Sequence, residues 1–225
     1  MTSKLYWFLL QSQDTAPSNI YPYPRMEKTT VPMCPQTVKL QNRIVYLDMA
    51  YNLDVISGKG NDYIFQSREI TEPNISKVNP VLHPMQHDGD DIVHIHCPYV
   101  FLSDNKNLEA NMLAPDVTTK HALGSSKVIE GLLPVGRYGR SLDVAIRFGE
   151  MERLQLVKGD HIAKLVFNDD VELIHIDPTD KILDYIKASF QVTLYTKGVR
   201  DIFKRAAAIY PYKELEKCEK IIHNR

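Results

Sequence analysis

The sequence predicts a mainly β protein with a helical segment at its C-terminal end. Two observations predict this fold class. Short apolar runs recur between turn residues up to about residue 176, and the apolar spacing then changes to a helical period. Several short strands at such spacing are typical of a sandwich, a jelly roll or a small barrel rather than an α/β sheet. We therefore expect a β-rich region over 1–176 and a basic helical segment over 177–225.

The expected strands are the apolar runs that lie between turn signals. Residues 5–10 (LYWFLL) form a compact run suited to a buried strand, whereas five prolines within 16–35 exclude a helix and favour an extended segment. A turn at 58–61 predicts a hairpin between its flanking strands. The expected strands are 5–10, 42–56, 62–66, 92–101, 141–148, 154–157, 161–167 and 172–176.

The C-terminal segment changes character at Asp177. This residue can cap a helix, and Pro178 is favoured just inside a helix start. Residues 181–225 carry ten Lys or Arg and five Asp or Glu. Three interpretations stay open: the apolar stripe covers the sheet, it contacts a protein partner, or the basic face binds nucleic acid. The stripe consists of Ile182, Ile186, Phe190 and Leu194, and the helical period also includes Leu183, Ile202, Phe203, Ala206 and Ile209.

Composition narrows the classes of function. The chain has 225 residues, of which 44% are hydrophobic, so it can form a core and is not a disordered polymer. A net charge of −1 gives no bulk electrostatic drive toward nucleic acid or anionic membrane. Three scattered cysteines argue for a reducing compartment. No run approaches the roughly 18 apolar residues of a membrane span, so we expect a cytoplasmic protein without membrane contact.

Histidines and carboxylates between residues 83 and 97 are the sharpest candidate for chemistry. His94 and His96 lie two apart on an expected strand, so they share one face and can bind one divalent metal ion. A carboxylate from 88–91 could complete the ligand set. The alternative is a polar, partly exposed sheet face that binds nothing. A divalent metal is the one cofactor that this pattern indicates.

Residues 139–148 and 158–167 carry a resemblance to a known family. Lys158-Gly-Asp160 followed by an apolar run resembles the late strand–turn–strand of dUTPases and dCTP deaminases, which have a β-clip fold. The run GRSLDVAIRF resembles their substrate-side strand, in which an Asp lies on the floor of a nucleotide pocket. The resemblance implies Asp143 as the general base that activates water. It also implies a phosphate-binding loop at Gly124, Ser125 and Ser126.

The same stretch departs from that family where catalysis needs it. Asp143 is not followed by the expected Tyr and Gly, and Ala163 is followed by Lys164 where the family has Gln. A helical segment occupies the place of the family's Gly/Ser/Thr-rich C-terminal flap. The fold could therefore be shared without the chemistry, because fold alone does not carry function.

The order of short segments along the whole chain is similar to that of a family of tailed-phage proteins. These segments are Cys34-Pro35, Asn42 with the aromatic and aliphatic strand that follows it, Asn52-Leu-Asp54, Phe101-Leu-Ser-Asp104, the run from Arg137 to Asp143, and Lys158-Gly-Asp160. The resemblance implies a host-cell cytoplasm or a virion as location and carries no activity with it.

The leading hypothesis is a non-catalytic phage protein that acts through binding or assembly as a symmetric oligomer. The missing catalytic motif residues favour it, and the apolar segments 5–10 and 16–35 suit contacts between subunits. Two alternatives stay open: a nucleotide hydrolase with Asp143 as its base, and a β protein that binds a divalent metal.

Overall fold

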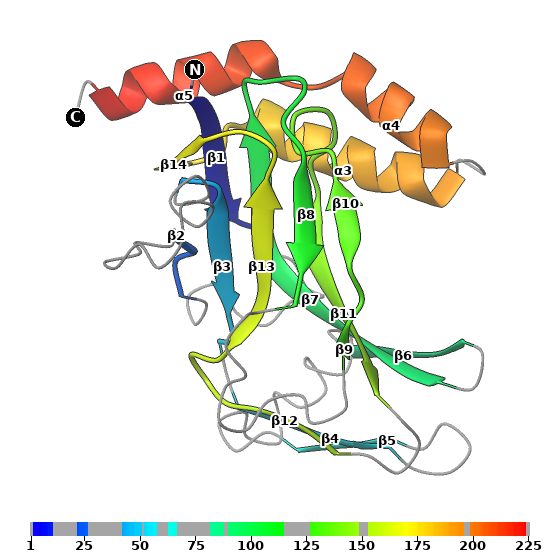
Figure 1. Ribbon diagram of the computed structural model, residues 1–225. Helices are drawn as coiled ribbons and strands as arrows, with labels where there is room; N and C mark the ends of the chain where they lie inside the picture. The colour runs from blue at the N-terminus through cyan, green and yellow to red at the C-terminus, as the bar shows by residue number, and fades with distance from the viewer. Residues whose placement is uncertain are drawn as a thin grey trace.

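The computed structural model confirms a mainly β chain with helices toward its C-terminal end (Figure 1). It describes residues 2–10, 22–26, 42–50, 52–57, 63–66, 82–87, 90–114, 127–148, 153–195 and 199–223. The strands of these ranges form three sheets, here called A, B and C. The finer fold type, β-clip or jelly roll, stays a prediction.

Sheet A has the strand order β14-β1-β7-β11-β9, and β6 also pairs with β7. The long strand β7 pairs with β1 over one part and with β6 over the other, while β11 runs antiparallel along its other side. The strands of sheet A are β1 (Ser3–Leu9), β6 (Leu82–His87), β7 (Asp90–Ser103), β9 (Lys127–Val128), β11 (Ser141–Phe148) and β14 (Val171–His175).

Sheet B has the order β10-β8-β13-β3-β2, and sheet C has the order β12-β4-β5. The antiparallel pair β4–β5 is the hairpin that the turn at 58–61 predicts. The strands of sheet B are β2 (Arg25–Met26), β3 (Ile44–Asp48), β8 (Ala110–Leu113), β10 (Gly131–Leu133) and β13 (His161–Phe167). Those of sheet C are β4 (Leu53–Ser57), β5 (Tyr63–Gln66) and β12 (Arg153–Leu156).

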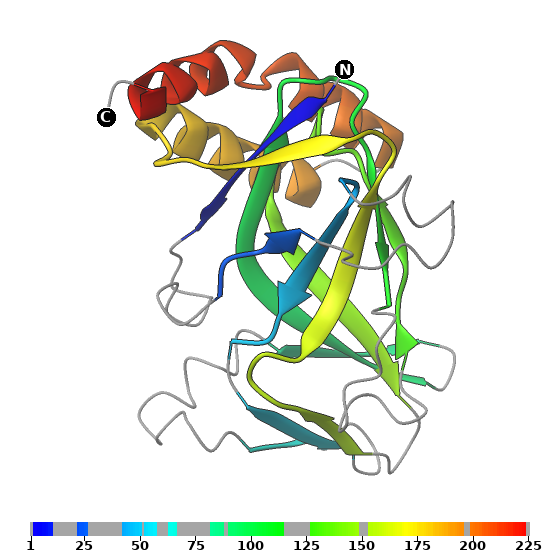
Figure 2. The ribbon, with the colours of Figure 1, turned by 60° about the vertical axis from the view of Figure 1, so that its left-hand side comes forward.

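The main core lies between sheets A and B, whose strands face one another (Figure 2). Alternate residues of each strand enter it, because successive side chains of a strand point to opposite faces. Cys97 is fully buried there, and burial raises the pKa of its thiol, so it behaves as a small core residue. Members of this core include Leu5, Trp7, Val45, Leu47, Ile95, Tyr99, Ala163 and Leu165.

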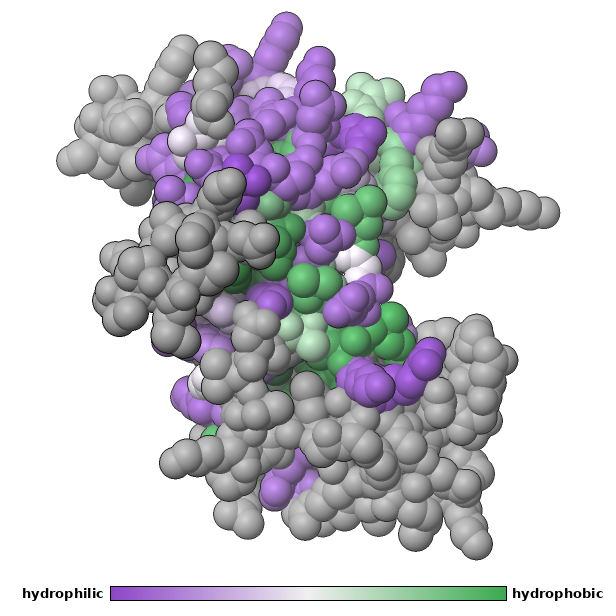
Figure 3. All heavy atoms as spheres, viewed as in Figure 1, coloured by the Kyte–Doolittle hydropathy of each residue, from purple (hydrophilic) through white to green (hydrophobic). Residues whose placement is uncertain are grey.

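Three helices cover the other face of sheet A at one end: α3 (Asp180–Tyr195), α4 (Val199–Ala208) and α5 (Tyr212–His223) (Figure 1). Ile182 and Ile186 pack with Tyr6 and Leu102 in a second apolar cluster, so this part of the predicted stripe covers the sheet. Hydrophilic side chains gather over this helical end, while apolar ones show over the strands beside it (Figure 3). None of the described helices is long and apolar enough to cross a membrane.

Two local predictions are wrong. Helix α3 begins at Asp180, and Thr179 rather than Asp177 caps it, because the Thr179 Oγ1 accepts the Ile182 N–H at 3.4 Å. The run 5–10 does not offer a surface to another subunit. It forms β1, which lies between β14 and β7 with Leu5 and Phe8 buried. Most of 16–35 lies outside the described residues.

Candidate functional site

A pocket of about 330 Å³ lies beside the helices on the helix-facing side of sheet A. Its volume is at the low end of the range for small-ligand pockets, which is about 300–1,000 Å³. Strands β7 and β11 form its floor, the connection from β10 to β11 forms one wall, and α4 forms the other. The residues of the floor and the two walls include His94, Ser141, Asp143, Ala145, Leu132, Pro134, Tyr138, Ile202 and Phe203.

Asp143 lies on the floor of this pocket, where it forms an ion pair with Arg140, three residues earlier in the chain. The Arg140 Nη2 donates to the Asp143 Oδ2, and the two side chains are 30% and 19% exposed. A general base needs a lone pair directed at the proton that it takes. Arg140 occupies Oδ2 of Asp143 and offsets the charge of its carboxylate, so the geometry favours a structural ion pair.

His94 lines the same pocket, although the sequence associates it with a metal and Asp143 with a nucleotide. The strand register places His94 opposite Ala145, and His96 opposite Asp143. The side chain of His96 is not among those that the structure describes. Within the described part of the chain, no group of three or more His, Cys, Asp or Glu side chains could hold a metal ion.

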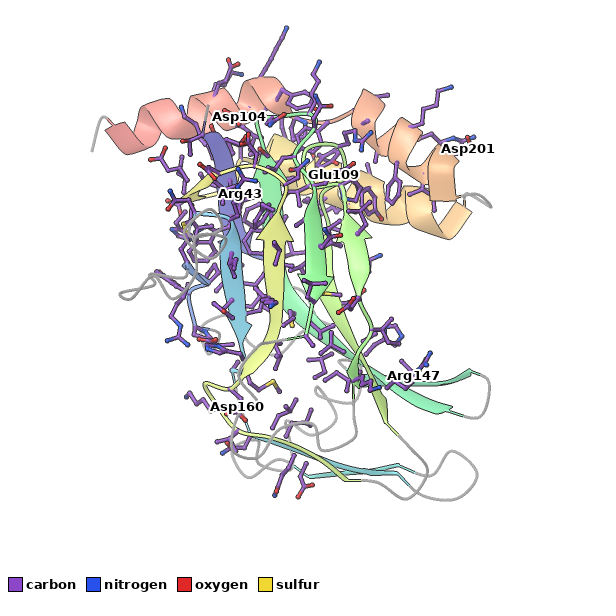
Figure 4. The ribbon with its side chains drawn as sticks, in the orientation of Figure 1. Arg43, Asp104, Glu109, Arg147, Asp160 and Asp201 are labelled. Atoms are coloured by element: carbon purple, nitrogen blue, oxygen red, sulfur yellow. The ribbon has the colours of Figure 1, made fainter. Side chains whose placement is uncertain are left out.

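The predicted phosphate-binding loop cannot be placed. Gly124, Ser125 and Ser126 lie outside the described residues, which resume at Lys127 in β9. The Lys158-Gly-Asp turn does join β12 to β13, as the sequence predicts (Figure 4). Its Asp160 accepts the Val157 N–H at 2.9 Å, and Gly159 has a φ of 87°. The turn therefore uses its own polar groups to hold its conformation.

The wall of the pocket between β10 and β11 is a turn that needs glycine at two positions. A Cβ atom on Gly136 would lie 1.9 Å from the backbone oxygen of Asn105. A Cβ atom on Gly139 would lie 2.3 Å from a methyl carbon of Leu102. The turn can approach β7 and its following loop this closely only without side chains at these two positions.

Three tyrosine hydroxyls of the helical layer hold the same turn. Tyr185 accepts the Gly139 N–H at 2.9 Å, and Tyr212 donates to the Gly136 carbonyl at 2.6 Å. Tyr210 accepts the Ser103 N–H at 2.7 Å and donates to the Val135 carbonyl at 2.8 Å. These bonds satisfy backbone groups that are otherwise buried without partners.

Burial favours the protonated form of these hydroxyls by raising their pKa values. It raises the pKa of Tyr185 to about 12 and raises the pKa of Tyr210 well above its ordinary value. Nothing in the local sequence pattern indicates that Tyr185, Tyr210 and Tyr212 position this turn. The two glycines, Gly136 and Gly139, are the one local sequence signal that this turn lies close to β7 and the loop after it.

Helix α4 closes the pocket through an aromatic contact. The rings of Tyr138 and Phe203 meet edge to face with centroids 5.4 Å apart. Tyr138 belongs to the turn that the tyrosine hydroxyls hold, and Phe203 belongs to α4. The helical segment therefore supplies one wall directly and fixes the other through hydrogen bonds.

A second polar cluster lies at the end of β3 in sheet B. Asp48 is buried, and its two oxygens accept from His161 Nδ1 and from an Arg25 nitrogen, each at 2.6 Å. The rings of Tyr46 and His161 stack with their centroids 4.6 Å apart. Because both carboxylate oxygens are occupied, this cluster ties β2, β3 and β13 together and is satisfied internally.

Comparison with known proteins adds no family to this description. No protein-family model matches the chain, and no curated protein matches it. The function must therefore be argued from the pocket and its residues.

Proposed function

We propose that this chain is a non-catalytic phage protein that acts by binding, and that the pocket between β11 and α4 holds a small, largely apolar ligand group. The Arg140–Asp143 ion pair on the pocket floor carries the proposal. Hydrolysis would depend on the Asp143 carboxylate, and the ion pair offsets the charge of this carboxylate with a guanidinium of the same chain. What remains for a ligand is a shaped apolar surface.

The walls support this assignment. Leu132, Ile202 and Phe203 give the pocket apolar sides, and Tyr138 adds an aromatic edge. Ligand sites are typically lined by apolar and aromatic side chains with a few polar groups that set orientation. His94 and Ser141 are polar groups of that kind at the floor.

Binding of 8-anilinonaphthalene-1-sulfonate, a fluorescent aromatic probe, tests the pocket directly. Ala145→Leu places a larger side chain on the floor, so we expect the affinity for the probe to fall at least about tenfold. The matched control is Ala208→Leu, which makes the same change at an exposed position of α4 and should leave the affinity unchanged. Equal affinity of wild type and Ala145→Leu would contradict the assignment.

A nucleotide hydrolase is the second candidate, because Asp143 and His94 line one pocket. For this function Asp143 would have to take a proton from water while Arg140 holds its Oδ2. We expect purified protein to hydrolyse or deaminate neither dUTP nor dCTP, as product analysis would show. Turnover at an enzymatic rate that Asp143→Asn abolishes would replace the binding proposal with the enzymatic one.

Self-association is a separate part of the proposal. With β1 buried inside sheet A, the symmetric oligomer loses one of the two segments that favoured it. Native mass spectrometry of the purified chain tests it, and a single monomer peak would remove it. The location in a host cytoplasm or a virion stays a prediction.

A further inference from the structure

Three neighbouring strands of sheet A bring residues that commonly bind metals into two adjacent rows. The register places His83 of β6 opposite His94 of β7. It places His96 of β7 opposite Asp143 of β11, one row further along. On the other side of His94, the register places Ala145 of β11, a small residue, directly opposite it.

These five positions belong to one face of the sheet. Residues two apart on a strand share a face, and so do residues directly opposite each other on paired strands. His94 and Asp143 line the pocket, which identifies the face as the one beside α4. Opposite positions on antiparallel strands lie only about 4.5–5.5 Å apart, and neighbouring rows are about 6.8 Å apart.

We propose that this face binds one divalent transition-metal ion of the Zn²⁺ class through His83, His94 and His96. A His-x-His strand with a third histidine from the adjacent strand supplies three imidazoles to one ion and leaves a further position open. Imidazole is a ligand type that suits Zn²⁺, Cu²⁺ and Ni²⁺. The side chains at 83 and 96 lie outside those that the structure describes, so the proposal rests on their register positions.

Asp143 has a different part in this assignment. Arg140 holds one oxygen of its carboxylate, so we assign Asp143, whose register position is opposite that of His96, as an orienting group rather than as a metal ligand. Metal-binding histidines commonly donate their second ring N–H to such a group. The inference does not depend on the apolar ligand of the pocket, and either one could hold without the other.

The test is calorimetric titration of Zn²⁺ into untagged protein that has been treated with a chelator and dialysed. We expect one Zn²⁺ per chain in the wild type. Loss of an orienting partner weakens metal binding about 10–100-fold, so Asp143→Asn should fall in that range. His83→Ala and His94→Ala each remove a ligand and should weaken binding more than about 100-fold.

His175→Ala is the matched control, because it removes an exposed imidazole from β14 of the same sheet. It should bind Zn²⁺ as the wild type does. Absence of Zn²⁺ binding by the wild type would overturn the proposal, as would His83→Ala with wild-type affinity. So would a His175→Ala variant that is weakened as much as His94→Ala.

The absorption spectrum of the Co²⁺-loaded wild type tests the site without any substitution that could unfold the chain. Intense d–d bands of a tetrahedral, imidazole-bound ion would support it. The weak spectrum of hydrated Co²⁺ would overturn it.

Discussion

One face of sheet A has two parts that differ in what covers them. In the helix-covered part, Tyr6, Phe8 and Leu102 are buried under the helical layer in an apolar cluster. In the pocket part, His94 and Asp143 line an open hollow that α4 borders. The same strand β7 runs through both parts. The difference indicates that the helices stabilise one part of the sheet and, through the turn 134–139, shape the other.

The largest expected effect on stability comes from the turn 134–139, which connects the two parts. Gly136→Ala puts a methyl group against the backbone of Asn105, so neither element can keep its place. We expect the free energy of unfolding in urea to fall by about 3 kcal/mol. Gly131→Ala is the matched control, since nothing lies within 4 Å of its added Cβ, and it should change stability by less than about 0.5 kcal/mol. Similar effects of the two substitutions would show that the turn is not tightly packed.

A smaller loss of stability should follow removal of the most connected hydroxyl. Tyr210→Phe leaves the Ser103 N–H and the Val135 carbonyl without their partner. We expect a loss of about 2 kcal/mol in the free energy of unfolding. Tyr23→Phe, at a side chain that is 64% exposed, is the control and should be close to neutral. If Tyr210→Phe is also neutral, the hydrogen bonds of Tyr210 do not couple the helices to the turn.

Alkaline pH should weaken the helix-covered part. The pKa of Tyr185 is raised to about 12 in the folded chain, whereas an unfolded tyrosine titrates near 10. The protonated hydroxyl therefore stabilises the fold fully below pH 10, and this stability is lost as the pH rises from about 10 to about 12. Urea unfolding across that range measures the slope, and Tyr185→Phe should reduce it. An unchanged slope would mean that other groups control alkaline unfolding.

The smallest expected change in stability comes from the pocket wall. Phe203→Ala removes the edge-to-face contact with Tyr138, which is worth about 1 kcal/mol. It should nevertheless clearly lower the affinity of the protein for the fluorescent probe, because Phe203 lines the pocket. A large loss of stability with unchanged probe affinity would mean that Phe203 stabilises the fold and does not contribute to ligand binding.

The positions of many strands could be predicted because they depend on local patterns. Burial alternates from Ala163 to Phe167 as a strand should, and the hairpin around 58–61 lies where its glycines indicate. Register could not be predicted, because pairs such as His83 with His94 depend on how separate strands meet. The cap of α3 was misplaced because both Asp177 and Thr179 are residue types that can cap.

The site was predicted only in fragments. The sequence pattern predicts a general base at Asp143 and a metal ligand at His94, and only the β7–β11 register places the two residues in one pocket. The ion pair with Arg140 was missed because nothing in the local pattern shows that the two side chains converge. The three tyrosine contacts were missed because a tyrosine that donates to a distant backbone group looks like any other in the sequence.

Amide chemical-shift mapping by NMR, with 8-anilinonaphthalene-1-sulfonate titrated into the wild type, tests the central claim most directly. The binding proposal predicts shifts that are concentrated at His94, Asp143, Ala145 and Phe203, with little change at Tyr6, Phe8 and Leu102. Shifts centred on the helix-covered part, or spread evenly over the chain, would contradict a ligand pocket between β11 and α4.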